Sequence, residues 1–151
     1  MRYLLLIMLG ILPLACSKKE SKKTESWTKD SLAFAKVRNY INDPANCTTI
    51  SWMDAMYKEL DTVKEGKQVE VSWRFKNTGN KPLIVANVTT SCDCTVVDKP
   101  KKAIATGGQG IIKAKFNTKD LQGWQRKDVY VLVNNKTNLV QTLSFAVNVI
   151  K

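Results

Sequence analysis

Apolar and polar residues alternate along several short stretches of the chain between residue 48 and the C-terminus. In the clearest of them, residues 68–75, every second residue is large and apolar, and polar residues occupy the positions between. Side chains of a β-strand point alternately to its two faces, so a period of two indicates a strand with one buried face. We therefore expect residues 68–75 to form a strand whose core side chains are Val69, Val71, Trp73 and Phe75.

Turn residues separate further apolar stretches in this part of the chain. Turns are expected at 65–67, 77–80 and 107–110, where glycine and asparagine gather. The other expected strands are 48–53, 83–88, 94–97, 111–116, 128–133 and 139–150. About seven short strands at this spacing are typical of an all-β sandwich of two antiparallel sheets, with a barrel as the alternative. The expected large core residues are Trp73, Phe75, Phe116, Tyr130 and Phe145.

The N-terminus has a different pattern, in which Arg2 precedes an apolar run over residues 3–14. This run is shorter than the roughly 20 residues that cross a bilayer, and its flanks are typical of a secretory signal peptide. It ends in L-P-L-A-C, residues 12–16, which resembles the lipobox of bacterial lipoproteins. That resemblance implies that residues 1–15 are a signal peptide and that Cys16 carries the lipid. The alternative is an ordinary thiol at Cys16 in an ordinary signal peptide.

Residues 16–44 are expected to connect the lipid to a folded domain, residues 45–151. The first part, 17–26, is polar and charged, which predicts a flexible tether. Farther along, apolar residues recur at helical spacing ahead of Pro44, so we expect a short amphipathic helix over 27–41. The apolar residues that define it are Trp27, Phe34, Val37 and Ile41.

A lipid anchor would place the protein in the cell envelope, outside the cytoplasm, where disulfides persist. Ser17, and not aspartate, follows the lipidated cysteine. By analogy with the lipoproteins of enteric bacteria, this favours the outer membrane, and the side that the domain faces stays open.

The chain is strongly basic, with a net charge of +11. Export argues against a nucleic-acid partner, so the expected partner is an envelope protein or an anionic polysaccharide, with anionic lipid headgroups also suited to the charge. The alternative is a solvated basic surface that binds nothing specific. The chain has no histidine, which excludes Ser-His-Asp and Cys-His catalysis as well as histidine-ligated zinc. We expect neither an enzyme nor a bound cofactor.

Three segments resemble the DUF1573 family of exported bacterial proteins. They are T-V-K-E-G-K-Q-V-E-V-S-W-R-F-K-N-T-G-N-K-P-L at 62–83, V-T-T-S-C-D-C-T at 88–95, and I-A-T-G-G-Q-G-I-I-K-A-K-F-N-T at 104–118. The resemblance covers about residues 48–150 and implies an immunoglobulin-like sandwich, often lipid-anchored, with no assigned activity. Two residues depart from the family pattern: Asp93 stands where glycine is usual, and Thr106 where proline is usual. The loss of glycine at 93 matters if the backbone there needs a positive φ.

The paired cysteines of S-C-D-C-T, Cys92 and Cys94, are the candidate site. In an extended strand their Cα atoms would lie about 6.6–6.8 Å apart, at the outer limit for a disulfide, so the chain must bend to join them. Three roles stay open: a structural role as a disulfide or as buried thiols, thiol–disulfide redox chemistry, or soft-metal binding. For a metal such as Cu(I), Cys92 and Cys94 would be the ligands and Cys47 a third.

The sequence therefore predicts a non-enzymatic, lipid-anchored envelope protein whose domain is a binding or structural module. The alternative function is a thiol redox or copper-handling protein that uses Cys92 and Cys94.

Overall fold

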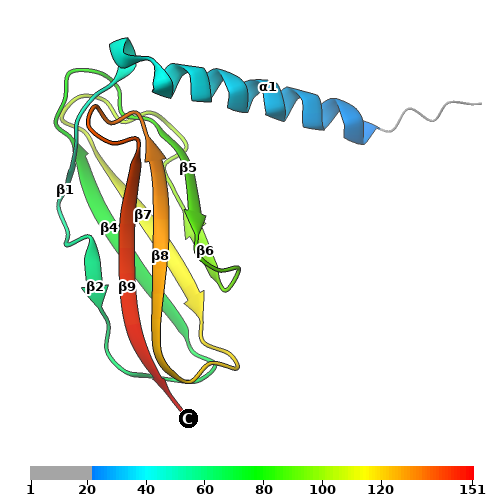
Figure 1. The fold of residues 1–151 in the computed structure, drawn as a ribbon, viewed down its shortest axis with the longest axis vertical. Helices are drawn as coiled ribbons and strands as arrows, with labels where there is room; N and C mark the ends of the chain where they lie inside the picture. Colours follow the sequence, from blue (N-terminus) through cyan, green and yellow to red (C-terminus); the bar gives the residue numbers. More distant parts are fainter. Residues whose placement is uncertain (1–21) are drawn as a thin grey trace, which may run out of the picture.

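The computed structural model describes the backbone of residues 22–151 and the side chains of residues 32–151. Two β-sheets pack face to face, and one helix leaves the sandwich at one end (Figure 1). The helical elements are α1 (Lys22–Asn42) and the short 3₁₀ helix η1 (Pro44–Asn46). The strands are β1 (Ile50–Trp52), β2 (Tyr57–Glu59), β3 (Val63–Lys64), β4 (Gln68–Asn77), β5 (Val85–Thr90), β6 (Thr95–Asp98), β7 (Gln109–Asn117), β8 (Gly123–Val133) and β9 (Val140–Ile150).

One sheet has four strands in the order β1-β4-β7-β6, and the other has five, in the order β2-β9-β8-β5, with β3 also on β9. Neighbouring strands are antiparallel except that β2 and β3 run parallel to β9. The predicted all-β sandwich of two sheets is therefore confirmed, and the barrel is not formed.

The core lies between the two sheets and follows the alternation along β4. Trp73 and Phe75 are fully buried, and Val69 and Val71 are at most 8% exposed. Phe116 of β7 meets Phe145 of β9 edge to face, with ring centroids 5.7 Å apart. Four of the five expected large core residues are therefore where the sequence placed them.

Tyr130 is the exception, because it points away from the core and is 39% exposed. Its neighbours Val129 and Val131 are fully buried, so the inward positions of β8 are the odd-numbered ones. Residues 129–133 are apolar on both faces of the strand, so the sequence pattern did not reveal which face is buried.

Residues 22–151 contain nine strands, two more than the sequence predicted. β2 and β3 were missed because their residues, such as Lys58 and Glu59, do not alternate in polarity. They form through backbone pairing with β9, in which Tyr57 lies opposite Ser144.

The predicted helix exists and is longer than expected, since α1 begins at Lys22 instead of residue 27. It therefore includes residues 22–26, which the sequence had placed in the tether. Among its described side chains, residues 32–42, Ile41 at the C-terminal end is 1% exposed, whereas Phe34 is 43% exposed. Figure 1 shows α1 leaving the end where β8 and β9 are joined and running across the strand direction. Over residues 22–151, the structure has no helix with the length and apolar character needed to span a bilayer.

Candidate functional site

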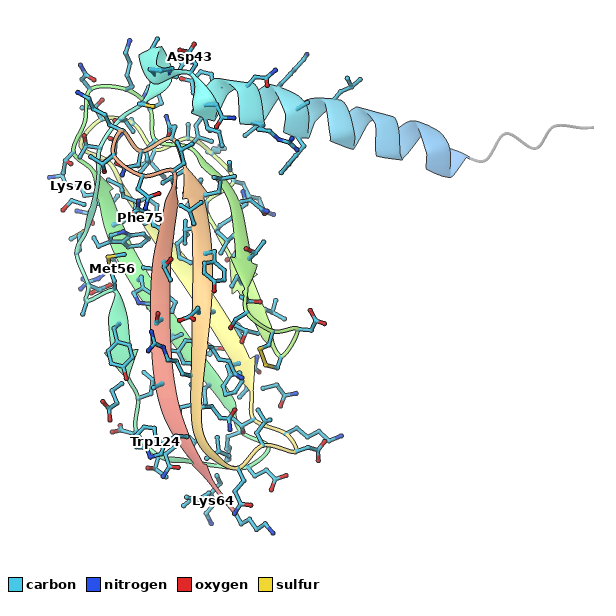
Figure 2. The ribbon with its side chains drawn as sticks, viewed as in Figure 1. Asp43, Met56, Lys64, Phe75, Lys76 and Trp124 are labelled. Carbon is cyan, nitrogen blue, oxygen red and sulfur yellow. A yellow bond between two sulfur atoms is a disulfide. The ribbon has the colours of Figure 1, made fainter. Side chains whose placement is uncertain are left out.

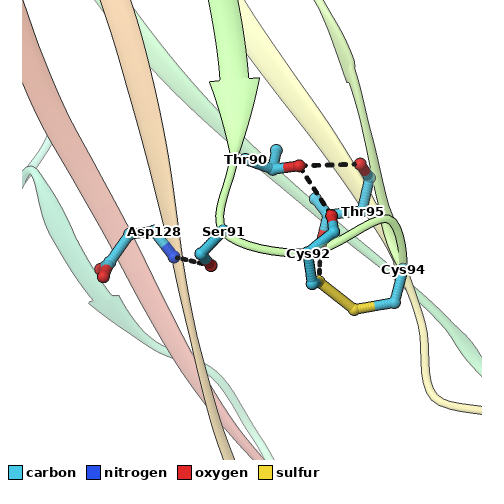
Figure 3. Close-up of a disulfide and its surroundings, with 6 residues drawn as sticks. All are labelled: Thr90, Ser91, Cys92, Cys94, Thr95 and Asp128. Carbon is cyan, nitrogen blue, oxygen red and sulfur yellow. Dashed lines mark hydrogen bonds between the residues drawn. A yellow bond between two sulfur atoms is a disulfide. The ribbon is translucent and has the colours of Figure 1, made fainter.

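Cys92 and Cys94 form a disulfide in the turn that connects β5 to β6 (Figure 3). Their Cα atoms lie 5.3 Å apart, closer than two residues of an extended strand, because the chain turns over residues 91–94. β5 belongs to the five-stranded sheet and β6 to the four-stranded sheet. The disulfide therefore closes the point where the chain passes from one sheet to the other.

Hydrogen bonds hold this turn on both sides. The Thr90 hydroxyl donates to the Cys92 carbonyl at 2.8 Å, and the Ser91 hydroxyl accepts from the backbone N–H of Asp128 at 3.1 Å (Figure 3). Cys92 Sγ lies 3.6 Å from the Thr95 hydroxyl. Across the described residues, Asp120 is the one non-glycine residue with a positive φ, so Asp93 replaces the usual glycine without backbone strain.

A groove of about 650 Å³ runs beside the disulfide, along the outer face of the four-stranded sheet. Cys94 and the exposed Val96 line it together with lysines and aspartates, namely Lys115, Lys119, Asp93 and Asp120. Charges of both signs are balanced here, so the groove does not select a ligand by net charge. It does make the Cys94 side of the disulfide accessible.

Cys47, the proposed third metal ligand, lies at the other end of the sandwich, beside α1. It is a half-buried free thiol whose Sγ is 3.6 Å from the Asp43 carbonyl. Within residues 32–151, no three histidine, cysteine or acidic side chains are grouped as a metal site would need. A disulfide offers no thiolate, so metal binding by Cys92 and Cys94 would first require reduction. Cys16 lies outside the described residues.

A buried polar network, which the sequence did not reveal, joins the loops at the end where α1 enters. The Asn77 side chain is 0% exposed and donates to the carbonyls of Lys81 and Ile104 at 2.7 and 2.9 Å. Its own side-chain oxygen accepts from the Thr48 hydroxyl at 2.9 Å. A side chain at Gly79 would collide with Thr48, so the Asn and Gly of N-T-G both serve the packing of these loops.

Asn134, directly after β8 of the five-stranded sheet, also joins neighbouring loops through its side chain. Its amide donates to the carbonyls of Asn46 and Pro82 at 2.7 and 2.9 Å, and its oxygen accepts from the Ile84 N–H at 2.8 Å. The two asparagines together join four loops through buried hydrogen bonds.

Comparison with protein families matches residues 50–149 to the model described as "Protein of unknown function (DUF1573)". This chain belongs to the DUF1573 family. The resemblance seen in the sequence is therefore confirmed, and the DUF1573 motifs can be assigned to structure: N-T-G to the buried network, C-x-C to the disulfide turn. The last glycine of G-G-Q-G, Gly110, is the second residue of β7 and packs directly against the ring of Phe75. A search of the curated proteins finds no match to this sequence.

Solved structures with a similar fold place this DUF1573 domain among immunoglobulin-like sandwiches. A protein of unknown function from Porphyromonas gingivalis W83 aligns with a TM-score of 0.60 at 14% identity, over 70% of this chain and 49% of that one. The PapD-like domain 7 of human CEP192 aligns with a TM-score of 0.51 at 10% identity, over 73% of this chain and 89% of that one. The chain thus spans about half of the Porphyromonas protein, and these likenesses concern the fold alone. The predicted immunoglobulin-like fold is confirmed.

The outer face of the five-stranded sheet carries exposed aromatic side chains. Trp124, Tyr57 and Tyr130 are 64%, 48% and 39% exposed, and Figure 2 shows Trp124 near the end of the sandwich opposite α1. The Arg126 guanidinium lies over the Tyr57 ring, 5.9 Å from its centroid. Sequence reasoning missed this DUF1573 surface, although a tryptophan inside the polar stretch Q-G-W-Q-R-K-D was a visible signal.

An ion pair fastens the β1–β2 connection to β4. The Asp54 carboxylate accepts from the Arg74 guanidinium at 2.7 Å and from the Arg74 backbone N–H at 2.7 Å. The side-chain hydrogen bond from Arg74, followed by the backbone one, holds the pKa of Asp54 well below its usual range. This pair has a structural role, since it pins a loop at the sheet edge.

Proposed function

We propose that this protein is a non-enzymatic, lipid-anchored module of the bacterial cell envelope, at the outer membrane, that binds a partner through its folded domain. The observation that carries the proposal is the aromatic face formed by Trp124, Tyr57 and Tyr130. L-P-L-A-C at residues 12–16 supports a lipid on Cys16.

Aromatic exposure of this kind favours binding. A tryptophan that is 64% exposed contributes little to the core, whereas aromatic residues and arginine are enriched in protein interfaces. Trp124 and Arg126 lie two residues apart on β8, so both point to the same outer face. The face therefore combines apolar area with a cation beside it.

The anchor is tested by growing cells with an alkyne-bearing fatty acid. We expect the wild-type protein to incorporate the label and to partition into detergent, and the Cys16→Ser variant to do neither. Equal labelling of both proteins would contradict lipidation at Cys16.

Binding through the aromatic face is tested by placing a photo-reactive amino acid at position 124 in living cells. Ile111 provides the matched control, because it is an apolar side chain, 37% exposed, on the outer face of the other sheet. We expect a recurrent cross-linked species from position 124 and none from 111. Identical products at both positions would refute a specific face, and turnover of any substrate that is lost on Cys92→Ser would refute a non-enzymatic role.

A second candidate function, thiol–disulfide exchange, is favoured by the accessibility of Cys94 in the groove. A substrate thiolate would attack Cys94 Sγ, and the Cys92–Cys94 bond would break with its electron pair leaving on Cys92 Sγ. The Thr95 hydroxyl, 3.6 Å away, can donate to that leaving thiolate. Attack by a second substrate thiolate on the mixed disulfide then releases Cys94, so a substrate dithiol is oxidised while the protein disulfide is reduced.

Exchange is tested by equilibrating the domain in glutathione buffers and counting alkylated thiols by intact mass. Partial reduction of the disulfide at an ordinary ratio of reduced to oxidised glutathione would support a redox function, and a fully resistant disulfide would exclude it.

The reduced pair is also the form that would bind a soft metal. The copper alternative fails if Cys92→Ser/Cys94→Ser leaves the copper content of the reduced protein unchanged.

A further inference from the structure

The two ends of the sandwich differ in charge. The helix end, as we call it, consists of the loops 43–49, 78–84, 99–108 and 134–139, which meet where α1 enters. These loops contain five lysines and a single acidic residue, Asp43: Lys81, Lys99, Lys101, Lys102 and Lys136. The opposite end consists of residues 60–67 and 118–122 with the C-terminus. Its four lysines are accompanied by three acidic side chains, Asp61, Glu65 and Asp120.

Most lysines of the helix end are exposed and available to bind a partner. Lys81, Lys101, Lys102 and Lys136 are exposed, and none of these four forms an ion pair with a carboxylate of residues 32–151. Lys99 is the exception, since its ammonium group donates to the Val85 carbonyl at 2.9 Å.

The polar network keeps these lysines on one surface. Asn77 bonds directly to the carbonyl of Lys81, and Asn134 lies in the loop that carries Lys136, two residues before it. Lys101 and Lys102 lie in the same long loop as Ile104, whose carbonyl is the second acceptor of Asn77. The basic groups therefore sit on loops that are fastened to one another.

The helix adds to the same surface. α1 leaves from this end and runs across the strand direction (Figure 1), so a plane that touches the loops can also run along the helix. Its last three turns carry Lys36 and Arg38 without any acidic residue between 32 and 42. The exposed Leu32 and Phe34 provide apolar side chains near these cations.

We propose that the helix end of the sandwich, with α1 beside it, docks on the anionic headgroups of a phospholipid bilayer. Charge complementarity carries the assignment, because clustered lysines beside a membrane are attracted to anionic lipids within a Debye length. The inference rests on the proposed lipid anchor in one respect, namely that the N-terminus leads from α1 toward the membrane. It gives the domain an orientation, with the disulfide turn and Trp124 directed away from the membrane surface.

The test uses residues 17–151, which lack the lipid but retain the whole domain, since every residue of the core cluster lies within the sandwich. Sedimentation with vesicles of phosphatidylglycerol and phosphatidylcholine is compared with sedimentation with phosphatidylcholine alone. We expect binding to the anionic vesicles only, and weaker binding as salt is raised.

A matched pair of variants identifies the surface. Lys81→Gln/Lys101→Gln/Lys136→Gln neutralises the helix end, and we expect binding to fall roughly 100-fold, about fivefold for each lysine. Lys64→Gln/Lys67→Gln/Lys119→Gln makes the same change in net charge at the opposite end, and we expect it to bind within about twofold of the parent. Circular dichroism checks that both variants remain folded.

Several results would overturn the proposal. They are equal binding to neutral vesicles, equal losses in the two variants, no loss in the helix-end variant, or binding to a soluble anionic polysaccharide but not to vesicles. Failure of the fatty-acid labelling would refute the anchor at Cys16 and would leave the vesicle result standing, so the two proposals fail separately.

Discussion

Replacing Asn77 with alanine removes the side chain that joins three loops at the helix end. Its amide group donates to the carbonyls of Lys81 and Ile104, and its oxygen accepts from the Thr48 hydroxyl. The side chain is 0% exposed, so water cannot take over these bonds unless the loops open. We expect this single substitution to be among the most destabilising polar changes in the domain.

The magnitude follows from the partners left behind. The Ile104 carbonyl keeps the bond from the Leu83 N–H at 2.8 Å, whereas the Lys81 carbonyl, the buried Thr48 hydroxyl and the Gly79 N–H lose their partner. Each buried polar group left unpaired costs about 1–3 kcal/mol. The Thr48 hydroxyl is buried, whereas the Lys81 carbonyl and the Gly79 N–H are part-buried and cost the lower end of that range. We therefore expect Asn77→Ala to lower the free energy of unfolding by about 3–5 kcal/mol.

Urea denaturation of residues 17–151 measures this loss. Asn80→Ala is the matched control, because Asn80 lies in the same turn but is exposed, and we expect it to change stability by less than about 0.5 kcal/mol. If Asn77→Ala costs no more than Asn80→Ala, the network does not hold the loops together and the reasoning is wrong.

Three further substitutions test other parts of the structure. The Cys92–Cys94 disulfide closes a loop of only three residues. Urea denaturation of Cys92→Ser/Cys94→Ser should therefore show a loss of only about 1–2 kcal/mol in the free energy of unfolding. Asp54→Ala should cost about 1 kcal/mol at neutral pH. The lowered pKa of Asp54 means that this contribution is present above the ordinary carboxyl pKa, about 4, and is lost as pH falls through the lowered value, so wild type and variant should converge in acid unfolding curves. Gly110→Ala should lower the melting temperature, because its methyl group meets the Phe75 ring, at a cost of about 1–3 kcal/mol.

The sequence predicted the strands and their buried side chains wherever one face of the strand is polar. β4 alternates strictly, and its core residues Trp73 and Phe75 were predicted correctly. β8 ends in residues that are apolar on both faces, so Tyr130 was placed on the wrong side. β2 has no alternation at all, since it depends on a partner strand that is distant in sequence.

The candidate site shows the same limit. The pair Cys92 and Cys94 was visible as a motif, but whether the sulfurs join depends on the bend of the turn. The network around Asn77 was invisible, because its partners Thr48 and Ile104 are 29 and 27 residues away along the chain. Hydrogen bonds between distant loops leave no periodic signal in a sequence.

The parallel pairing of β2 with β9 also constrains the order in which the chain can fold. Tyr57 pairs with Ser144, so β2 leaves the ribosome long before its partner exists. β9 lies between β2 and β8 in the sheet, and until its residues are made β8 has no neighbour on that side. β2 must therefore wait, unpaired, until the eleven residues of β9 have been made. A chain that ends before Val140 would lack the strand that joins β2 to the rest of the sheet and would expose open strand edges to other unfinished chains.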